Sequence, residues 1–224
     1  RPETFEVKSA PTRPLALLYV GGVSEPKGVG DLLRALAEDR TSWASLVLAG
    51  DGEVDAMRAL AESLGLAERV RFLDRIPFAE VLPTMREADA LVVYSRHAYP
   101  EGAPGTIYQG LTARLPIIVS DHPMFTPYLR DGRDAIVARE RDPRALAAAI
   151  RVLAGDPGLY ERLSANAPAT FARLEHPVRW GDLIMRWLAD GSADRSWLAA
   201  NALPAWIDLD TGEPRPRGGL EATT

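Results

Sequence analysis

The sequence predicts a doubly wound parallel α/β sheet of about six strands, Rossmann-like in type, and two observations support this prediction. First, short and continuously apolar runs recur along the chain, which is typical of parallel strands that are covered on both faces. Second, these runs alternate with longer segments whose apolar residues recur at helical spacing. The composition is that of an ordinary globular protein, because 46% of the 224 residues are hydrophobic and 25% are charged.

The first part of the chain contains three strand and helix pairs. The run Leu-Ala-Leu-Leu-Tyr-Val-Gly predicts the first strand at 15–21, and a helix is expected over 26–39. The second helix is expected to end near Gly65, since glycine commonly follows the last helical turn. The second and third pairs are predicted at 44–50 with 54–66, and at 70–76 with 78–88.

The pattern continues to residue 156 and then changes. Strands are predicted at 89–95, 116–121 and 134–139, with helices at about 105–114 and at 143–156. The last of these helices has a proline in its first turn, a common helix start. Two further helices are expected at 157–175 and 177–190 as a helical carboxyl-terminal extension, followed by a tail rich in proline and glycine that we expect to be partly disordered.

Charge and composition exclude several classes of function. A net charge of −5 argues against a nucleic-acid partner, which normally requires a basic surface. The absence of cysteine excludes disulfides and thiolate metal sites, and the three histidines stand far apart in sequence, so no metal or other cofactor is expected. Because no run of about 18 apolar residues and no signal peptide is recognisable, we expect no transmembrane segment and a cytoplasmic location.

Ligands of doubly wound sheets bind beyond the carboxyl ends of the strands, so the turns there are the candidate sites. In the turn at 20–30, Gly21 and Gly22 allow backbone N–H groups to approach a ligand closely. Lys27 stands at the start of the next helix, where free N–H groups and the helix dipole favour an anion. This combination indicates a phosphate site, although a tight turn with an exposed lysine explains it equally well.

The stretch Tyr-Pro-Glu-Gly-Ala-Pro-Gly-Thr-Ile-Tyr-Gln at 99–109 is more informative. Glu101 lies just past a predicted buried strand and can accept hydroxyl hydrogen bonds, and the residues from Gly102 to Gly105 form a flexible loop. Gly105 and Thr106 begin a helix with free N–H groups, and Gln109 shares a helix face with Thr106. Together these groups favour a sugar-phosphate site over an acid–base catalyst; the alternative is a plain helix entry with an exposed glutamate.

Weaker candidates follow the other strands. Arg75 and Ile76 end the third predicted strand, where they could bracket a flat base or simply lie exposed in a loop. His97 could donate to a ligand, but a solvated loop histidine is the simpler interpretation. Asp121 follows the fifth predicted strand, where a cap of the next helix is a sufficient role for it.

Six motifs in order now resemble a known family: VGG....KGVGDLLRAL, LVLAGDGE, VRFLDRI, ADALVVYS, EGAPGTIYQGL and LPIIVSD. Over roughly residues 14–155 the chain resembles the carboxyl-terminal, nucleotide-sugar-binding half of a family-4 glycosyltransferase of the GT-B fold. The resemblance implies transfer of a sugar from a UDP-, GDP- or ADP-linked donor to an acceptor, with retention of configuration and without a bound metal.

The resemblance also implies roles for individual residues. Lys27 would hold the donor diphosphate and Glu101 the sugar hydroxyls, which makes these two the catalytic candidates. The backbone amides of the segment from Ala103 through Pro104 and Gly105 to Thr106 would contact the sugar and phosphate. Arg75 and Ile76 would flank the base.

Two positions depart from the family pattern. Gly22 stands where the family has an arginine, so one phosphate-binding charge is missing. Gln109 stands where the family has a second glutamate that contacts the ribose; its amide can still hydrogen-bond a hydroxyl but lacks the charge that strengthens such bonds. The departures leave open reduced affinity, another donor, or lost catalysis, and the last would make the chain a degenerate, non-catalytic module that serves as an interaction surface.

By the same resemblance, residues 1–13 are expected to be a linker from an amino-terminal acceptor domain, 14–190 the donor-binding domain and 191–224 the tail. We therefore expect the isolated chain to bind nucleotide but to transfer little sugar, and peripheral association with an inner membrane stays open. A nucleotide-sugar epimerase of the same fold is a further alternative, which would need a second domain. A receiver domain is disfavoured because the first turn lacks its acidic cluster.

Overall fold

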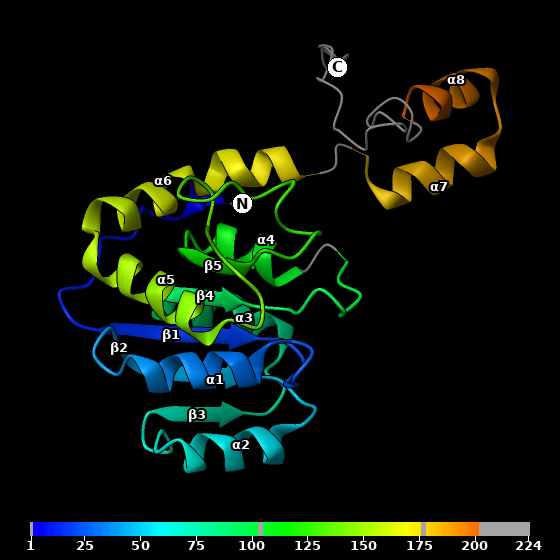
Figure 1. Ribbon diagram of the computed structural model, residues 1–224. Helices are drawn as coiled ribbons and strands as arrows, with labels where there is room; N and C mark the ends of the chain where they lie inside the picture. Colours follow the sequence, from blue (N-terminus) through cyan, green and yellow to red (C-terminus); the bar gives the residue numbers. More distant parts are fainter. Residues whose placement is uncertain (1, 103–104, 176–177, 202–224) are drawn as a thin grey trace. The chain divides into compact units, whose positions relative to one another are not determined.

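The computed structural model describes residues 2–102, 105–175 and 178–201. The chain divides into two compact units, residues 1–174 and 175–224, and each is described by itself (Figure 1). The domain boundaries expected from the sequence, 1–13, 14–190 and 191–224, remain a prediction.

The first unit contains one parallel sheet of six strands, which confirms the predicted doubly wound α/β fold. The order across the sheet is β3-β2-β1-β4-β5-β6, so the chain winds outward from the centre in both directions. The strands are β1 (Leu15–Val20), β2 (Trp43–Ala49), β3 (Val70–Leu73), β4 (Ala90–Val93), β5 (Ile117–Ser120) and β6 (Ile136–Ala138).

Helices cover both faces of this sheet (Figure 1). Apolar residues of α1, α2 and α5 belong to one buried cluster, whereas those of α3 and α4 belong to the other, and α6 contributes to both. The strands β4 and β5 are buried at every position, as expected for continuous apolar runs. The helices are α1 (Val29–Glu38), α2 (Val54–Ser63), α3 (Phe78–Glu87), α4 (Gly105–Thr112), α5 (Pro143–Gly155) and α6 (Pro157–Leu174), with a short 3₁₀ turn, η1 (Pro2–Thr4).

The predicted strands are correct in number and order but too long at their carboxyl ends. β3 ends at Leu73 and β4 at Val93, so the residues that follow belong to loops. Tyr94 and Ser95 are as buried as strand residues, each 1% exposed, but they lie beyond the paired register of β4. An apolar run therefore marks burial correctly and does not mark where the hydrogen-bonded ladder stops.

Lys8 attaches the amino-terminal segment to the first unit. Its Nζ donates to the carbonyl oxygens of Arg86, at 2.7 Å, and Ala88, at 2.6 Å, at the carboxyl end of α3, where the negative end of the helix dipole favours a cation. Burial lowers the pKa of the Lys8 amine, and the neighbouring Arg86 adds to this effect.

The second unit contains α7 (Trp180–Ala189) and α8 (Ser192–Ala200). Arg186 joins them, because its Nη1 lies 3.1 Å from Asp194 Oδ1 and its guanidinium 4.7 Å from the Trp197 ring centroid. The sequence predicts α7 but not α8, and the tail after residue 201 lies outside the described residues. No helix in the described parts of the chain is long and apolar enough to span a membrane.

Candidate functional site

The candidate site lies where β1 and β4 run side by side at the centre of the sheet. Leu17 pairs with Ala90 and Leu18 with Leu91, although 73 positions separate the members of each pair. Chain winding reverses between these strands, since β2 follows on one side and β5 on the other. Doubly wound sheets bind ligands at such a switch point, beyond the carboxyl ends of the strands.

The loops that follow β1 and β4 are in direct backbone contact. The N–H of Arg96 donates to the carbonyl oxygen of Pro26 at 2.9 Å. Gly28 has a φ of +73°, and a Cβ at this position would lie 1.9 Å from the carbonyl oxygen of Tyr94. Only glycine accepts both the conformation and the approach, so Gly28 brings the neighbouring Lys27 against the second loop.

Lys27 and Glu101 form the centre of the site. The Lys27 Nζ and the Ser95 hydroxyl both donate to Glu101 Oε1. The Glu101 side chain is 5% exposed and that of Lys27 18%. The Lys27 ammonium also lies 4.3 Å from the ring centroid of Tyr99, a cation–π contact. Within the described residues nothing donates to Oε2 of this nearly buried carboxylate, so Oε2 can accept a hydrogen bond from a ligand.

The two glycines after β1 differ in what they offer a ligand. The N–H of Gly21 already donates to the carbonyl of Ala49 at 3.0 Å, whereas Gly22 is exposed and a Cβ there would meet no atom within 4 Å. The Tyr19 hydroxyl donates to the Gly22 carbonyl at 2.5 Å. Burial raises the pKa of the Tyr19 phenol, and the Glu101 carboxylate raises it further, so the hydroxyl remains a donor.

Helix α4 begins at Gly105, four positions after Glu101. Gly102 and Gly105 are exposed, while Thr106 and Gln109 are half-buried, and the Gln109 side chain has no hydrogen-bond partner in the described part of the chain. Ala103 and Pro104 lie outside the described residues. The free N–H groups at this helix start are suited to an anion.

Arg75 and Ile76 lie in the loop after the edge strand β3, not in the strand itself. The Arg75 side chain is 81% exposed, with its Nη1 3.7 Å from Asp51 Oδ2, and Ile76 packs half-buried against the core. Neither residue contacts Lys27 or Glu101 among the described interactions. Both pairs of residues, Arg75 with Ile76 and Lys27 with Glu101, lie at the carboxyl edge of the sheet, but at different positions along it.

Ser95, Tyr99 and Arg96 contribute to the site and are not among the sequence candidates. Ser95 could have been found, since it is a polar residue at the end of an apolar run, next to the motif of Glu101. Arg96 gives no such signal, because its partners Asp31 and Glu25 are 65 and 71 positions away in sequence.

A cavity of about 290 Å³ lies against the same loop. Its lining includes Tyr99, which carries the Lys27 contact, and Arg141, whose backbone has a φ of +55°. Within the described residues no group of three or more histidine, aspartate and glutamate side chains is arranged to hold a metal ion.

The chain is similar in sequence to a family of known proteins. The model of the family described as "Glycosyl transferases group 1" matches residues 1–170. The lipopolysaccharide core biosynthesis glycosyltransferase LpsD of Rhizobium meliloti is 33% identical over 161 residues, 71% of this chain and 45% of its own length. The glycogen synthase of Mycobacterium tuberculosis strain H37Rv is 29% identical over 179 residues, 79% of this chain and 42% of its own length.

Among solved structures, the Anabaena protein HepE in complex with UDP and glucose is similar in fold, with a TM-score of 0.65 at 21% identity; the match covers 72% of this chain and 44% of HepE. The chain spans less than half the length of the curated relatives it matches. The likeness to HepE concerns the fold alone.

Proposed function

Because the chain belongs to the group 1 glycosyl transferases, we propose that it forms the donor-binding part of an enzyme that transfers a sugar from a nucleoside diphosphate to an acceptor. One observation carries the proposal. A nearly buried carboxylate, Glu101, leaves one oxygen without a hydrogen bond from the described residues, directly beside the ammonium of Lys27. A sugar hydroxyl suits the first group and a phosphate the second.

Lys27 is proposed to act on the diphosphate. When the glycosidic bond to the nucleotide breaks, negative charge grows on the departing phosphate oxygens, and a positioned ammonium stabilises this charge. The site is partly shielded from water, with the Lys27 side chain 18% exposed, which strengthens the interaction. The N–H groups at the start of α4 would add to it.

Glu101 is proposed to orient the donor sugar. Its Oε1 accepts hydrogen bonds from Lys27 and Ser95, which fix the carboxylate. Its Oε2 would accept a hydrogen bond from a hydroxyl group of the sugar. Because the carboxylate is fixed, the sugar that it binds is held with its anomeric carbon in position for attack. Gln109, without a side-chain partner in the described residues, is proposed to contact the ribose, and Arg75 and Ile76 the base. Reaction with retention, as in family 4, and without a metal is part of the proposal, as is an acceptor domain beyond this chain.

The first test is a calorimetric titration of UDP, GDP, ADP and UDP-glucose into this chain. UDP is the first choice because the similar HepE was solved with UDP and glucose. We expect one nucleoside diphosphate to bind and its sugar form to bind more tightly. If none of the four binds at about 1 mM, which corresponds to about −4 kcal/mol, this chain does not form a donor site. Binding without any sugar transfer by the longer protein would instead support the non-catalytic module.

Gly22→Arg is expected to increase the affinity for the bound nucleoside diphosphate by roughly five- to tenfold. The new guanidinium would add a charge-assisted hydrogen bond to a phosphate, worth about 1 kcal/mol at an exposed site. The backbone tolerates the change because a Cβ at Gly22 meets no atom within 4 Å. Titration of UDP measures it, with Gly22→Ala as the matched control. An affinity equal to that of the control would place the phosphates away from Gly22.

A further inference from the structure

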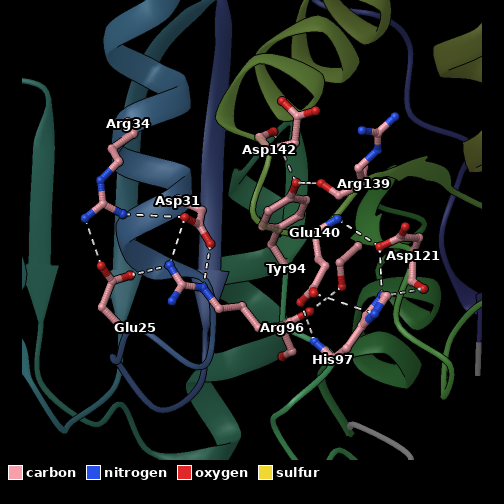
Figure 2. Close-up of polar contacts among 12 residues, drawn as sticks. Glu25, Asp31, Arg34, Tyr94, Arg96, His97, Asp121, Arg139, Glu140 and Asp142 are labelled. Carbon is pink, nitrogen blue, oxygen red and sulfur yellow. Dashed lines mark hydrogen bonds and ion pairs between the residues drawn. The ribbon is translucent and has the colours of Figure 1, made fainter.

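Two adjacent residues of the β4–α4 loop, Arg96 and His97, bind to opposite sides of the site (Figure 2). Arg96 binds the α1 side. Its Nε lies 2.8 Å from Asp31 Oδ2 and its Nη2 lies 2.9 Å from Asp31 Oδ1, a bidentate pair, while Nη2 also lies 3.1 Å from Glu25 Oε2. The Asp31 side chain is 5% exposed, so this pair is well shielded from solvent. The hydrogen bonds that Arg96 donates to the Asp31 carboxylate raise the pKa of Arg96.

His97 binds the β5 and β6 side. Its backbone N–H donates to Glu140 Oε2 at 2.5 Å, and its ring Nε2 lies 3.0 Å from Asp121 Oδ1. The Glu140 N–H in turn donates to Asp121 Oδ1 at 2.8 Å. Asp121 follows β5 and Glu140 follows β6, so His97 joins the loops of three neighbouring strands (Figure 2).

Backbone hydrogen bonds fix the segment between these two residues and Glu101. The Tyr99 N–H donates to the Arg96 carbonyl at 2.9 Å, and the Glu101 N–H donates to the Tyr99 carbonyl at 2.8 Å. His122, which is buried, places its Nε2 3.0 Å from the Tyr99 carbonyl, and its Nδ1 accepts the N–H of Met124. Because this segment is hydrogen-bonded, the positions of Arg96 and His97 determine where Glu101 lies.

We propose that Arg96 and His97 are positioning residues, which hold the β4–α4 loop from both sides so that Glu101 stands beside Lys27 and presents Oε2 to the donor sugar. The inference rests on the proposed function for its ligand. Its geometry does not, because every attachment is a contact between residues of the chain itself.

Hydrogen–deuterium exchange of the free chain tests the geometry. Arg96→Lys keeps the charge but loses the bidentate pair, and His97→Ala removes a ring that is 42% exposed, so both variants should fold. Exchange across residues 95–102 is expected to become faster in both. Arg34→Ala is the matched control, because Arg34 pairs with the same Glu25 and Asp31 but has no contact with this loop among the described interactions. Unchanged exchange in Arg96→Lys and His97→Ala, or an equal change in Arg34→Ala, would overturn the proposal.

Titration of UDP and UDP-glucose tests the consequence for the ligand. In both variants the ratio of the UDP Kd to the UDP-glucose Kd is expected to fall by about fivefold or more, while the UDP Kd changes by less than about threefold, because only the sugar contact is misplaced. A purely structural role would change both constants alike and would overturn the proposal. If UDP-glucose has no advantage over UDP in the unaltered chain, the proposed function fails, and the exchange result alone decides whether the two residues hold the loop.

Discussion

Lys27→Ala lowers the affinity of the chain for UDP by roughly 10- to 100-fold in the expected result. A hydrogen bond between an ammonium and a phosphate contributes about 1.5–3 kcal/mol, and the change removes that bond together with the cation. No other lysine can replace it, since Lys8 is bound to the carbonyl oxygens at the end of α3. Calorimetric titration of UDP measures the loss.

Two controls separate this loss from general effects. Arg162→Ala removes one positive charge from an exposed position on α6, and it should leave the UDP affinity within about twofold. Lys27→Ala also leaves the Glu101 carboxylate buried, with the Ser95 hydroxyl as its one remaining donor among the described residues, so thermal unfolding of each variant shows whether the fold is intact. An intact Lys27→Ala variant that binds UDP like the unaltered chain would remove Lys27 from the phosphate site.

Glu101→Gln is expected to remove most of the advantage of UDP-glucose over UDP. An amide keeps the size of the side chain but loses the charge, and a hydrogen bond to a charged acceptor contributes about 1.5–3 kcal/mol, or roughly 10- to 100-fold in affinity. UDP itself should bind within about threefold of its original affinity, or more tightly, because Lys27 is released from its ion pair. Parallel titrations of the two ligands measure the difference.

Glu161→Gln is the matched control for this change, since it alters an exposed carboxylate on α6 in the same way. Its two affinities should equal those of the unaltered chain. A Glu101→Gln variant that loses UDP and UDP-glucose to the same extent would show that Glu101 acts by holding Lys27 and does not contact the sugar.

The sheet could be predicted because each strand is a short apolar run with helical segments on both sides. The prediction was weaker where local pattern and tertiary structure separate. The segment of α8, Ser-Ala-Asp-Arg-Ser-Trp-Leu-Ala-Ala, has only two large apolar residues and so shows no helical stripe. It is held by the contacts of Arg186 with Asp194 and Trp197, and such contacts leave no periodicity in the sequence.

The sequence predicts Lys27 and Glu101 as site residues, but it does not predict that Arg96 and His97 hold the β4–α4 loop. Lys27 and Glu101 each stand just after an apolar run, and the topology of a doubly wound sheet brings such positions together. Arg96 and His97 stand in the same loop, yet their partners follow other strands. No spacing rule links Arg96 to Asp31 across 65 positions, because that pairing depends on how α1 lies against β4.

The adjacency of β1 and β4 also has a consequence for the order of folding. Lys27 and Glu101 stand 74 positions apart, and during synthesis β1, β2 and β3 are all made before β4 exists. Until β4 is made, one edge of β1 has no neighbouring strand. Bringing β4 beside β1 closes a long loop of chain, and the entropy lost in closing it is offset by the packing that follows. The ion pair at the centre of the site can form only after β4 has been made, so the proposed nucleotide would bind chains whose sheet is already closed at its middle.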